Sequence, residues 1–285
     1  MQSLQKVIEI LELEEIEQNH YRAVSPNEGW QRVYGGQVIG QALVAASRTV
    51  AEDRHAHSLH GYFLRAGDTE TPILYKVERI RDGRSFTTRQ VVAIQKGQPI
   101  FTMSISFQIA EEGLTHQFPM PDLPGPETLR DENELQAEQA QDWPEEYRDS
   151  FSMTSAIQLR AVEPIDLMHP KATPPIQNCW MKTRESLPDD PRLHQCVLAY
   201  LSDWSLLDTA MRPHAINFLQ DNVQVASLDH AMWFHRPFRA DEWLLYAQDS
   251  PAAGNARGFN RGLIYNQAGE LVASTTQEGL MRLHD

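Results

Sequence analysis

The first third of the chain combines one strongly apolar segment with several alternating ones. Residues 35–50 read GGQVIGQALVAASRTV, in which small residues are interspersed with branched apolar ones and no formal charge precedes Arg48. This composition predicts a buried helix that its neighbours approach closely. Strand-like segments, separated by turn pairs such as Asp82-Gly83, follow over residues 56–66, 71–82, 86–96 and 99–109. The pattern therefore predicts an antiparallel sheet wrapped around one helix.

The same pattern occurs a second time. Residues 72–108 and 243–279 align at an offset of about 171–172 residues, so that Leu74-Tyr75 corresponds to Leu245-Tyr246 and Arg89 to Arg261. A repeat of this length indicates two copies of one small domain, whose differences should carry the function. In the second copy we expect a long helix over 191–211 and strands near 158–164, 178–185, 222–236, 242–250, 256–266 and 271–283.

Residues 111–150 differ in kind from both copies. They are rich in Pro, Glu, Asp and Gln and have little periodicity, which predicts a linker with some helix around 127–141. The expected organisation is an N-terminal domain over residues 1–110, a linker over 111–155 and a C-terminal domain over 156–285.

Composition narrows the possible partners. The chain has 285 residues and a formal net charge of −14, which argues against a nucleic-acid partner, because phosphates require a basic surface. No uninterrupted apolar run reaches the length of a membrane span. The acidic N-terminus lacks a secretion signal, so we expect a cytoplasmic protein. Cys179 and Cys196 fit neither a disulfide framework nor a metal knuckle, and two free thiols are expected.

No cofactor or metal is expected from the sequence. The known nucleotide-binding and metalloprotease motifs are absent from the printed chain, and so is a nucleophile elbow. Among the scattered histidines, His55, His57 and His60 cluster best, and two of them would share one face of a strand. A structural role is the favoured interpretation, with a metal site as the alternative.

Asp203 is the most informative acidic residue. On a helix over 191–211, spacing by three and four places it on one stripe with Cys196, Tyr200, Leu207 and Ala210, where it is the only charge. An acid on such a stripe either faces solvent or is buried for a purpose, and burial of a carboxylate raises its pKa. Asp208, in contrast, has Arg212 four residues later, and a surface ion pair would explain it.

Ser227 and Gln277 are polar residues expected on inward faces of strands. Alternation in residues 271–281 turns Gln277 inward and Glu278 outward, and Ser227 shares a face with Val223 and Val225. Each alone is most simply a satisfied core group. Together with Asp203 they form a plausible water-binding cluster, and the first copy has Ile105 where Gln277 stands.

His230 follows Asp229 directly and could be read as a catalytic pair with it. Adjacent strand residues point to opposite faces of a sheet, so we expect no direct relay between these two side chains.

Seven segments of the chain are distinctive when they are taken together: YGGQVIGQAL (34–43), HSLHGYFLRAGD (57–68), DGRSF (82–86), LDHAMWFHRPF (228–238), EWLLY (242–246), ARGF (256–259) and ASTTQEGLMR (273–282). In these segments the chain resembles the acyl-CoA thioesterase II (TesB-type) enzymes, which have a double hotdog fold. The segments cover both copies and are missing only in the linker.

The resemblance implies an α+β double hotdog, in which each repeat wraps an antiparallel sheet around a helix and the two sheets are continuous. It also implies hydrolysis of acyl-CoA to fatty acid and CoA, with a catalytic trio at Asp203, Ser227 and Gln277. The family commonly has Thr at the second position, and Ser keeps its hydroxyl. Ala231 and Ala66 stand where the family usually has Ser and Pro.

On this basis we expect water to attack the thioester directly, with Asp203 as base or orienting group and with Ser227 and Gln277 holding the water. Arg257 and Arg261 are candidates to contact the CoA phosphates, and a homo-oligomer (dimer or tetramer) is expected because sheet edges and faces need cover. Two alternatives stay open: a non-catalytic acyl-CoA-binding protein and an enoyl-CoA hydratase-like enzyme, which would want an Asp–His pair.

Overall fold

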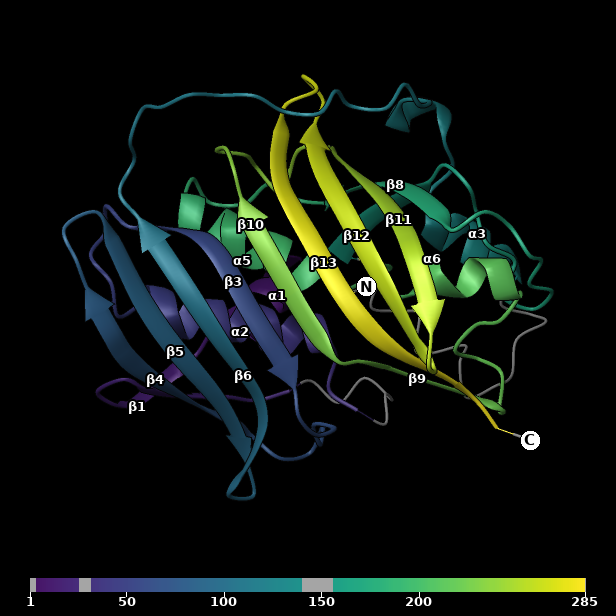
Figure 1. The fold of residues 1–285 in the computed structure, drawn as a ribbon. Helices are drawn as coiled ribbons and strands as arrows, with labels where there is room; N and C mark the ends of the chain where they lie inside the picture. Colours follow the sequence, from purple (N-terminus) through teal and green to yellow (C-terminus); the bar gives the residue numbers. More distant parts are fainter. Residues whose placement is uncertain (1–3, 26–31, 140–155, 285) are drawn as a thin grey trace.

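The computed structural model describes residues 4–25, 32–139 and 156–284. Strands from both halves of these residues join into one 13-stranded sheet, in the order β1-β2-β4-β5-β6-β3-β10-β13-β12-β11-β8-β7, with β9 added beside β13. Every strand pairing in these ranges is antiparallel. The predicted continuous sheet is confirmed (Figure 1).

The N-terminal half contains the first buried helix and its strands. Its elements are α1 (Leu4–Leu11), β1 (Glu14–Glu17), β2 (His20–Ala23), α2 (Gly35–Ser47), β3 (His55–Phe63), β4 (Ile73–Asp82), β5 (Phe86–Gln95) and β6 (Gln98–Gln108). The connection to the second half contains a short 3-10 turn, η1 (Pro126–Thr128), and α3 (Glu132–Gln139).

The C-terminal half repeats this arrangement. Its elements are β7 (Ile157–Ala161), β8 (Ile176–Thr183), α5 (Pro191–Leu201), α6 (Asp208–Met211), η4 (Arg212–His214), β9 (Val223–Ser227), β10 (Asp229–Phe234), β11 (Leu244–Gly254), β12 (Arg257–Asn266) and β13 (Leu271–Leu283). The strands β4-β5-β6 and β11-β12-β13 are the two segments that repeat in the sequence. The halves join where β3 pairs with β10, with Leu59 opposite Met232.

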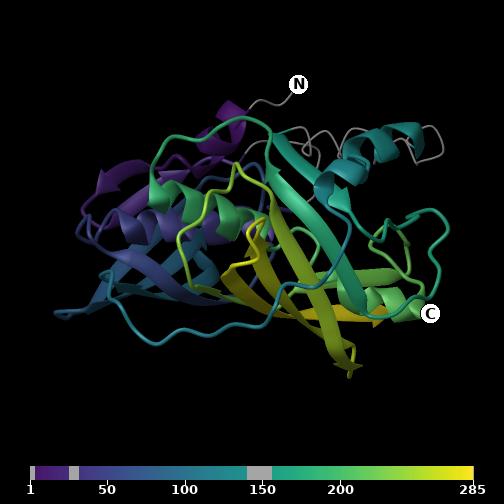
Figure 2. The ribbon, with the colours of Figure 1, turned by 90° about the horizontal axis from the view of Figure 1, so that it is seen from above.

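The helices α2 and α5 lie together on one side of the curved sheet (Figure 2). They approach so closely that a Cβ atom on Gly36 would lie 2.2 Å from the carbonyl oxygen of Tyr200. Gly40 lies one turn later on α2, and a Cβ there would meet the carbonyl oxygen of Cys196 at 3.2 Å. These contacts confirm that the small residues of 35–50 serve close packing. The C-terminal end of α5 is therefore fixed against the N-terminal end of α2.

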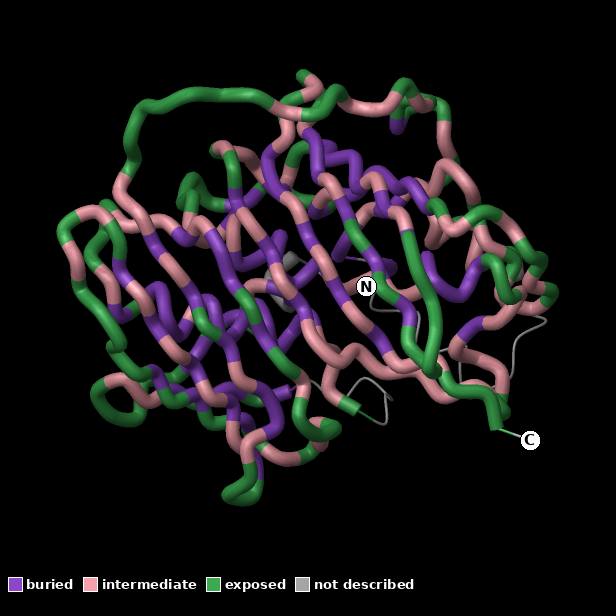
Figure 3. The backbone as a smooth tube through the Cα atoms, in the orientation of Figure 1, coloured by how far each residue is buried: buried purple, intermediate pink, exposed green. Residues whose placement is uncertain are grey.

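Buried residues alternate with less buried ones along several strands, in agreement with the sequence pattern (Figure 3). In β13, Thr275 and Gln277 are buried, whereas Glu278 is only partly buried. Ile105 of β6, the counterpart of Gln277, is fully buried in the core. The orientation predicted for these residues is confirmed.

Two predicted elements are wrong in their extent. The helix expected over 191–211 ends at Leu201, and a turn separates it from α6. The hydroxyl of Tyr246 donates to the carbonyl oxygen of Ser202 at 2.8 Å, so that this helix-end carbonyl finds a tertiary partner and the helix need not continue. The strand expected over 222–236 is interrupted at Leu228, which separates β9 from β10.

The connecting segment packs against the C-terminal half. Trp180 donates to the carbonyl oxygen of Pro124 at 2.9 Å, and Gln117 donates to that of Gly269 at 2.7 Å. Met120, Leu123 and Leu129 cover an apolar cluster on that half of the sheet. The predicted linker therefore follows the surface of the C-terminal half, although residues 140–155 of it lie outside the described residues.

Candidate functional site

Asp203 lies in the turn after α5, at the end of the helix that meets α2. A Cβ atom on Gly35 would come within 2.6 Å of Asp203 Oδ2, so the carboxylate lies directly against the start of α2. The backbone N–H of Gly36 donates to it. The bare glycine backbone makes room for the carboxylate, and the N-terminal end of a helix is a favourable place for negative charge.

The structure brings the three predicted residues Asp203, Ser227 and Gln277 together. The hydroxyl of Ser227 donates to Asp203 Oδ1 at 3.2 Å, and Gln277 Nε2 donates to Ser227 Oγ at 2.9 Å. Gln277 also donates to the Asp203 carboxylate. They come from the α5–α6 turn, the end of β9 and the middle of β13, and Gly279 of β13 lies opposite Ser227.

Burial dominates the electrostatics of this carboxylate. Desolvation raises the pKa of Asp203 from 3.8 to about 6, although hydrogen bonds from Gln277, Ser227 and Gly36 each oppose that rise. A carboxyl with such a pKa is ionised at neutral pH yet remains a useful proton acceptor.

His230 belongs to the same network, whereas the sequence analysis considered it only as a partner of Asp229. Its Nδ1 lies 2.6 Å from Gln277 Oε1, and its Nε2 lies 2.9 Å from the hydroxyl of Ser202. It is buried on the inner face of β10 together with Met232 and Phe234. The signal was its place in the strand alternation, because an inward histidine between apolar residues needs polar partners.

Asp229 and His230 make no contact that would form a relay, as the alternation predicted. The carboxylate of Asp229 accepts the backbone N–H of Glu278 at 2.7 Å. That contact occurs beside Leu228, where the interruption between β9 and β10 leaves the ladder irregular. Asp229 therefore replaces a backbone acceptor of the sheet.

A cavity of about 500 Å³ opens beside Asp203 and Ser227. The start of α2 contributes Tyr34 and Gly35 to its wall. The remaining wall is mainly apolar, and its larger apolar side chains are Leu135, Leu159, Ile165, Leu167, Trp204, Leu207, Met211, Phe218 and Val225. It also includes the acidic residues Glu132, Glu163, Asp166 and Asp208. Gln277 is fully buried behind Asp203 and Ser227 and does not line the cavity. The site is thus a buried carboxylate at the wall of an apolar cavity.

Asp208 is not a surface ion pair with Arg212. Asp208 lines the cavity, where burial and the nearby Glu132 raise its pKa to about 7. Arg212 is buried and donates to Thr173 Oγ1 at 3.2 Å and to the carbonyl oxygen of Glu163 at 3.3 Å. The four-residue helical spacing is present in α6, but the two side chains face different surroundings, since Asp208 lines the cavity and the guanidinium of Arg212 binds Thr173 and the backbone of Glu163.

Arg257 and Arg261 are not brought to this site. Both are exposed on β12, whereas Gly258 and Asn260, which lie between them in the strand, are buried. Arg257 pairs with Glu278 at 2.8 Å, and Arg261 pairs with both carboxylate oxygens of Asp249 at 2.9 Å. They therefore lie on the outer face of the sheet. Arg32, in contrast, is exposed and lines the cavity.

Two of the three clustered histidines have structural partners. His57 lies 2.8 Å from the hydroxyl of Ser106, and the ring of His60 makes an edge contact with Trp233. Cys179 and Cys196 are free and buried.

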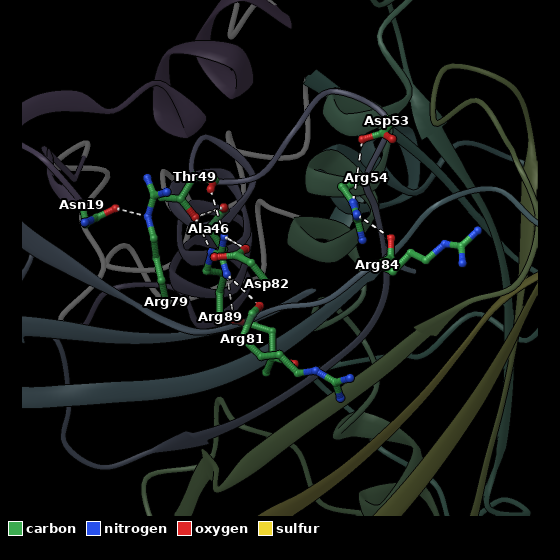
Figure 4. Close-up of polar contacts among 11 residues, drawn as sticks. Asn19, Ala46, Thr49, Asp53, Arg54, Arg79, Arg81, Asp82, Arg84 and Arg89 are labelled. Atoms are coloured by element: carbon green, nitrogen blue, oxygen red, sulfur yellow. Dashed lines mark hydrogen bonds and ion pairs between the residues drawn. The ribbon is translucent and has the colours of Figure 1, made fainter. Parts of the chain in front are cut away.

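The corresponding place in the first copy is filled by an arginine. Thr49 follows the C-cap residue of α2, as Asp203 follows that of α5. The fully buried Arg89 donates through Nε to Thr49 Oγ1 at 2.8 Å and also to the carboxylate of Asp82 (Figure 4). A guanidinium thus occupies the first copy where the second copy holds a carboxylate beside a cavity.

Each half of the chain matches a known protein family. Residues 26–108 match the family described as "Acyl-CoA thioesterase N-terminal domain", and residues 160–280 match the family described as "Acyl-CoA thioesterase".

Individual proteins are similar over nearly the whole chain. "Acyl-CoA thioesterase 2" of Haemophilus influenzae is 40% identical over 99% of both chains. "Acyl-coenzyme A thioesterase 8" of Mus musculus is 43% identical over 97% of this chain and 89% of its own. The crystal structure of acyl-CoA thioesterase II TesB2 from Mycobacterium marinum has a TM-score of 0.82 and 46% identity, covering 98% of this chain and 99% of that one. A hot dog fold protein from Alicyclobacillus acidocaldarius shares the fold at 16% identity, with a TM-score of 0.78.

The raised pKa of Asp203 predicts a pH-dependent effect of Asp203→Asn on stability. Between about pH 4 and pH 6 the folded protein keeps a proton that the unfolded chain has released, so the contribution of this carboxyl to stability is lost as the pH rises through about 6. The Asn variant does not titrate and should gain about 3 kcal/mol relative to wild type between pH 4 and pH 8. Urea unfolding of both proteins across this range measures the difference.

The matched control for this measurement is Asp122→Asn, because Asp122 is exposed. A stability difference between Asp203→Asn and wild type that stays constant with pH would contradict the assigned pKa.

Proposed function

Because the chain belongs to the acyl-CoA thioesterase family, we propose that it hydrolyses acyl-CoA to a free fatty acid and CoA through the site at Asp203. The observation that carries this proposal is a buried carboxylate with a pKa of about 6 at the wall of an apolar cavity. The apolar side chains of the cavity wall favour an acyl chain there, because each CH₂ that leaves water contributes about 0.8 kcal/mol to binding.

The proposed reaction is direct attack by water on the thioester carbonyl carbon. Asp203 takes a proton from the attacking water while the water oxygen bonds to the carbonyl carbon. The C–S bond then breaks, and the proton held by Asp203 passes to the departing thiolate. Ser227, which also lines the cavity, offers its hydroxyl to the water. Gln277 acts from behind by holding both Asp203 and Ser227.

The start of α2 supports the negative charge that develops on the carbonyl oxygen. Gly35 lines the cavity beside Asp203. The first N–H groups of a helix have no partner within the helix, and they can stabilise an oxyanion. The two halves of the chain therefore divide the work: the second provides the base, and the first provides the helix end.

The alternatives left open by the sequence fit this geometry less well. An enoyl-CoA hydratase-like enzyme would use an Asp–His pair, but Asp229 and His230 have separate partners. A protein that binds acyl-CoA without hydrolysis has no need for a carboxylate held at a raised pKa. Incubation with palmitoyl-CoA and a thiol reagent distinguishes them, because only hydrolysis releases free CoA.

Substitutions within the trio should separate the base from the groups that position it. Asp203→Asn should lower kcat about 10²–10⁴-fold, because the amide cannot accept the proton. Gln277→Ala should cost less, since Gln277 neither lines the cavity nor takes a proton. Steady-state kinetics with palmitoyl-CoA, together with the melting temperature of each variant, measures these effects.

Ser227 provides a matched pair of controls. Ser227→Thr keeps the hydroxyl and should be tolerated, whereas Ser227→Ala removes it and should lower kcat. An Asp203→Asn protein with near wild-type turnover would exclude Asp203 as the base.

Basic residues must meet the CoA phosphates in an otherwise acidic chain. We propose Arg32, at the cavity, as one such contact; Arg257 and Arg261 stay candidates, although each has a carboxylate partner. KM for palmitoyl-CoA should rise with salt, because screening weakens such contacts. Arg32→Ala should raise KM and reduce the salt dependence. A KM that does not change with salt would contradict a phosphate contact.

We also propose that the chain forms a homo-oligomer in a reducing compartment such as the cytoplasm. Support for an oligomer comes from side chains on the outer face at the junction of β3 and β10, where Tyr62 is 61% exposed and the exposed His60 contacts Trp233. Support for a reducing compartment comes from the two free thiols. In the described part of the chain no helix is long and apolar enough to cross a membrane. Light scattering at micromolar concentration should give a dimer or tetramer, and a monomer would contradict this.

A further inference from the structure

We propose that His230 is a positioning residue that fixes the orientation of the Gln277 amide and, through it, the geometry of Ser227 and Asp203. This inference rests on the proposed function, because it assigns a role toward the same base. It concerns a residue that touches neither the cavity nor the proposed water.

The contacts around Gln277 use its amide completely. One N–H of Nε2 is directed to Ser227 Oγ at 2.9 Å, and the amide also donates to the Asp203 carboxylate. On the other side, Oε1 lies 2.6 Å from His230 Nδ1. Gln277 and His230 are both almost completely buried, so water does not replace either partner.

The orientation of the Gln277 amide decides whether Ser227 and Asp203 keep their hydrogen-bond donor. With its present orientation, Nε2 faces two acceptors. Rotation of the amide by half a turn would place Oε1 against the Asp203 carboxylate and would turn Nε2 toward the histidine. Two oxygen acceptors would then face each other in a buried place, and Ser227 would lose a donor. Gln277 needs a partner that accepts only one of the two orientations.

His230 is such a partner when its neutral ring carries the proton on Nδ1, because that N–H donates only to the oxygen end of the amide. An amide oxygen accepts only, so Nδ1 must carry the proton that is donated to Gln277 Oε1. Nε2 is then an acceptor, and the single proton of the Ser202 hydroxyl goes to this nitrogen at 2.9 Å and not to the carbonyl oxygen of Ala199, which lies equally close. Burial lowers the pKa of His230 to about 4, and the ring therefore stays neutral in this tautomer at neutral pH.

Ser202 ties this histidine to the turn that carries Asp203. It is the C-cap residue of α5 and immediately precedes Asp203. Its carbonyl oxygen accepts from Tyr246 at 2.8 Å, while its hydroxyl faces His230. The chain of contacts therefore closes on itself, from the turn through His230, Gln277 and Ser227 back to Asp203.

A pair of substitutions of similar size isolates the donated hydrogen bond. His230→Asn can place its amide N–H near the position of Nδ1, whereas His230→Leu fills similar space without a donor. We expect His230→Leu to lower kcat about tenfold, the value of one typical hydrogen bond, with KM nearly unchanged. His230→Asn should recover most of that loss. Melting temperatures of both variants report any effect on stability alone.

A double-mutant cycle distinguishes positioning from a structural role. If His230 acts through Gln277, then His230→Leu should cost little further turnover in a Gln277→Ala background. A role in packing alone would lower turnover by the same factor in both backgrounds. Equal loss in the two backgrounds, or wild-type kcat for His230→Leu, would overturn the proposal.

The tautomer can be observed directly. Nitrogen NMR of protein labelled at histidine should show Nδ1–H protonated and Nε2 unprotonated for His230 at neutral pH. A ring protonated at Nε2 alone would overturn the proposal. The thioesterase function is tested separately, by hydrolysis in the wild type and its loss in Asp203→Asn. Failure of the His230 proposal can therefore be told apart from failure of the proposed function.

Discussion

The burial of one carboxylate, that of Asp203, is the constraint on which the candidate site depends. A buried carboxylate is costly unless donors surround it. Here the donors come from three separate places: Gly36 at the start of α2, Ser227 at the end of β9 and Gln277 in β13. Even so, desolvation prevails and holds the pKa near 6. The burial that costs folding free energy thus also gives Asp203 the raised pKa that a general base requires.

Close helix packing makes this arrangement possible. Gly36 lets the backbone of α2 approach Tyr200 at the end of α5, and Gly35 leaves room for the carboxylate itself. The hydroxyl of Tyr34 also donates to the carbonyl oxygen of Tyr200 at 2.9 Å. The site therefore belongs to neither half alone. It exists where the helix end of the first copy meets the turn of the second.

The two copies have diverged at equivalent places. Thr49 and Arg89 form a filled, hydrogen-bonded core in the first copy, whereas Asp203 and Gln277 border a cavity in the second. Ile105 in place of Gln277 removes the amide on which our proposed network depends. A few side chains thus decide whether this place in the fold is a closed core, as in the first copy, or borders a cavity, as in the second.

The sequence alone determined the two-copy architecture, the buried glycine-rich helix and the inward faces of Ser227 and Gln277, because periodicity and repetition are local properties of the chain. It did not determine where the second helix ends, because the partner of the helix-end carbonyl of Ser202 is Tyr246, which is distant in sequence. For the same reason it did not connect His230 to Gln277, because the contact between them crosses strands that are distant in sequence. It also placed Asp208 on the surface, although the tertiary fold turns this residue into the cavity. Spacing along a chain identifies the face on which a residue lies, whereas packing of distant segments decides what that face meets.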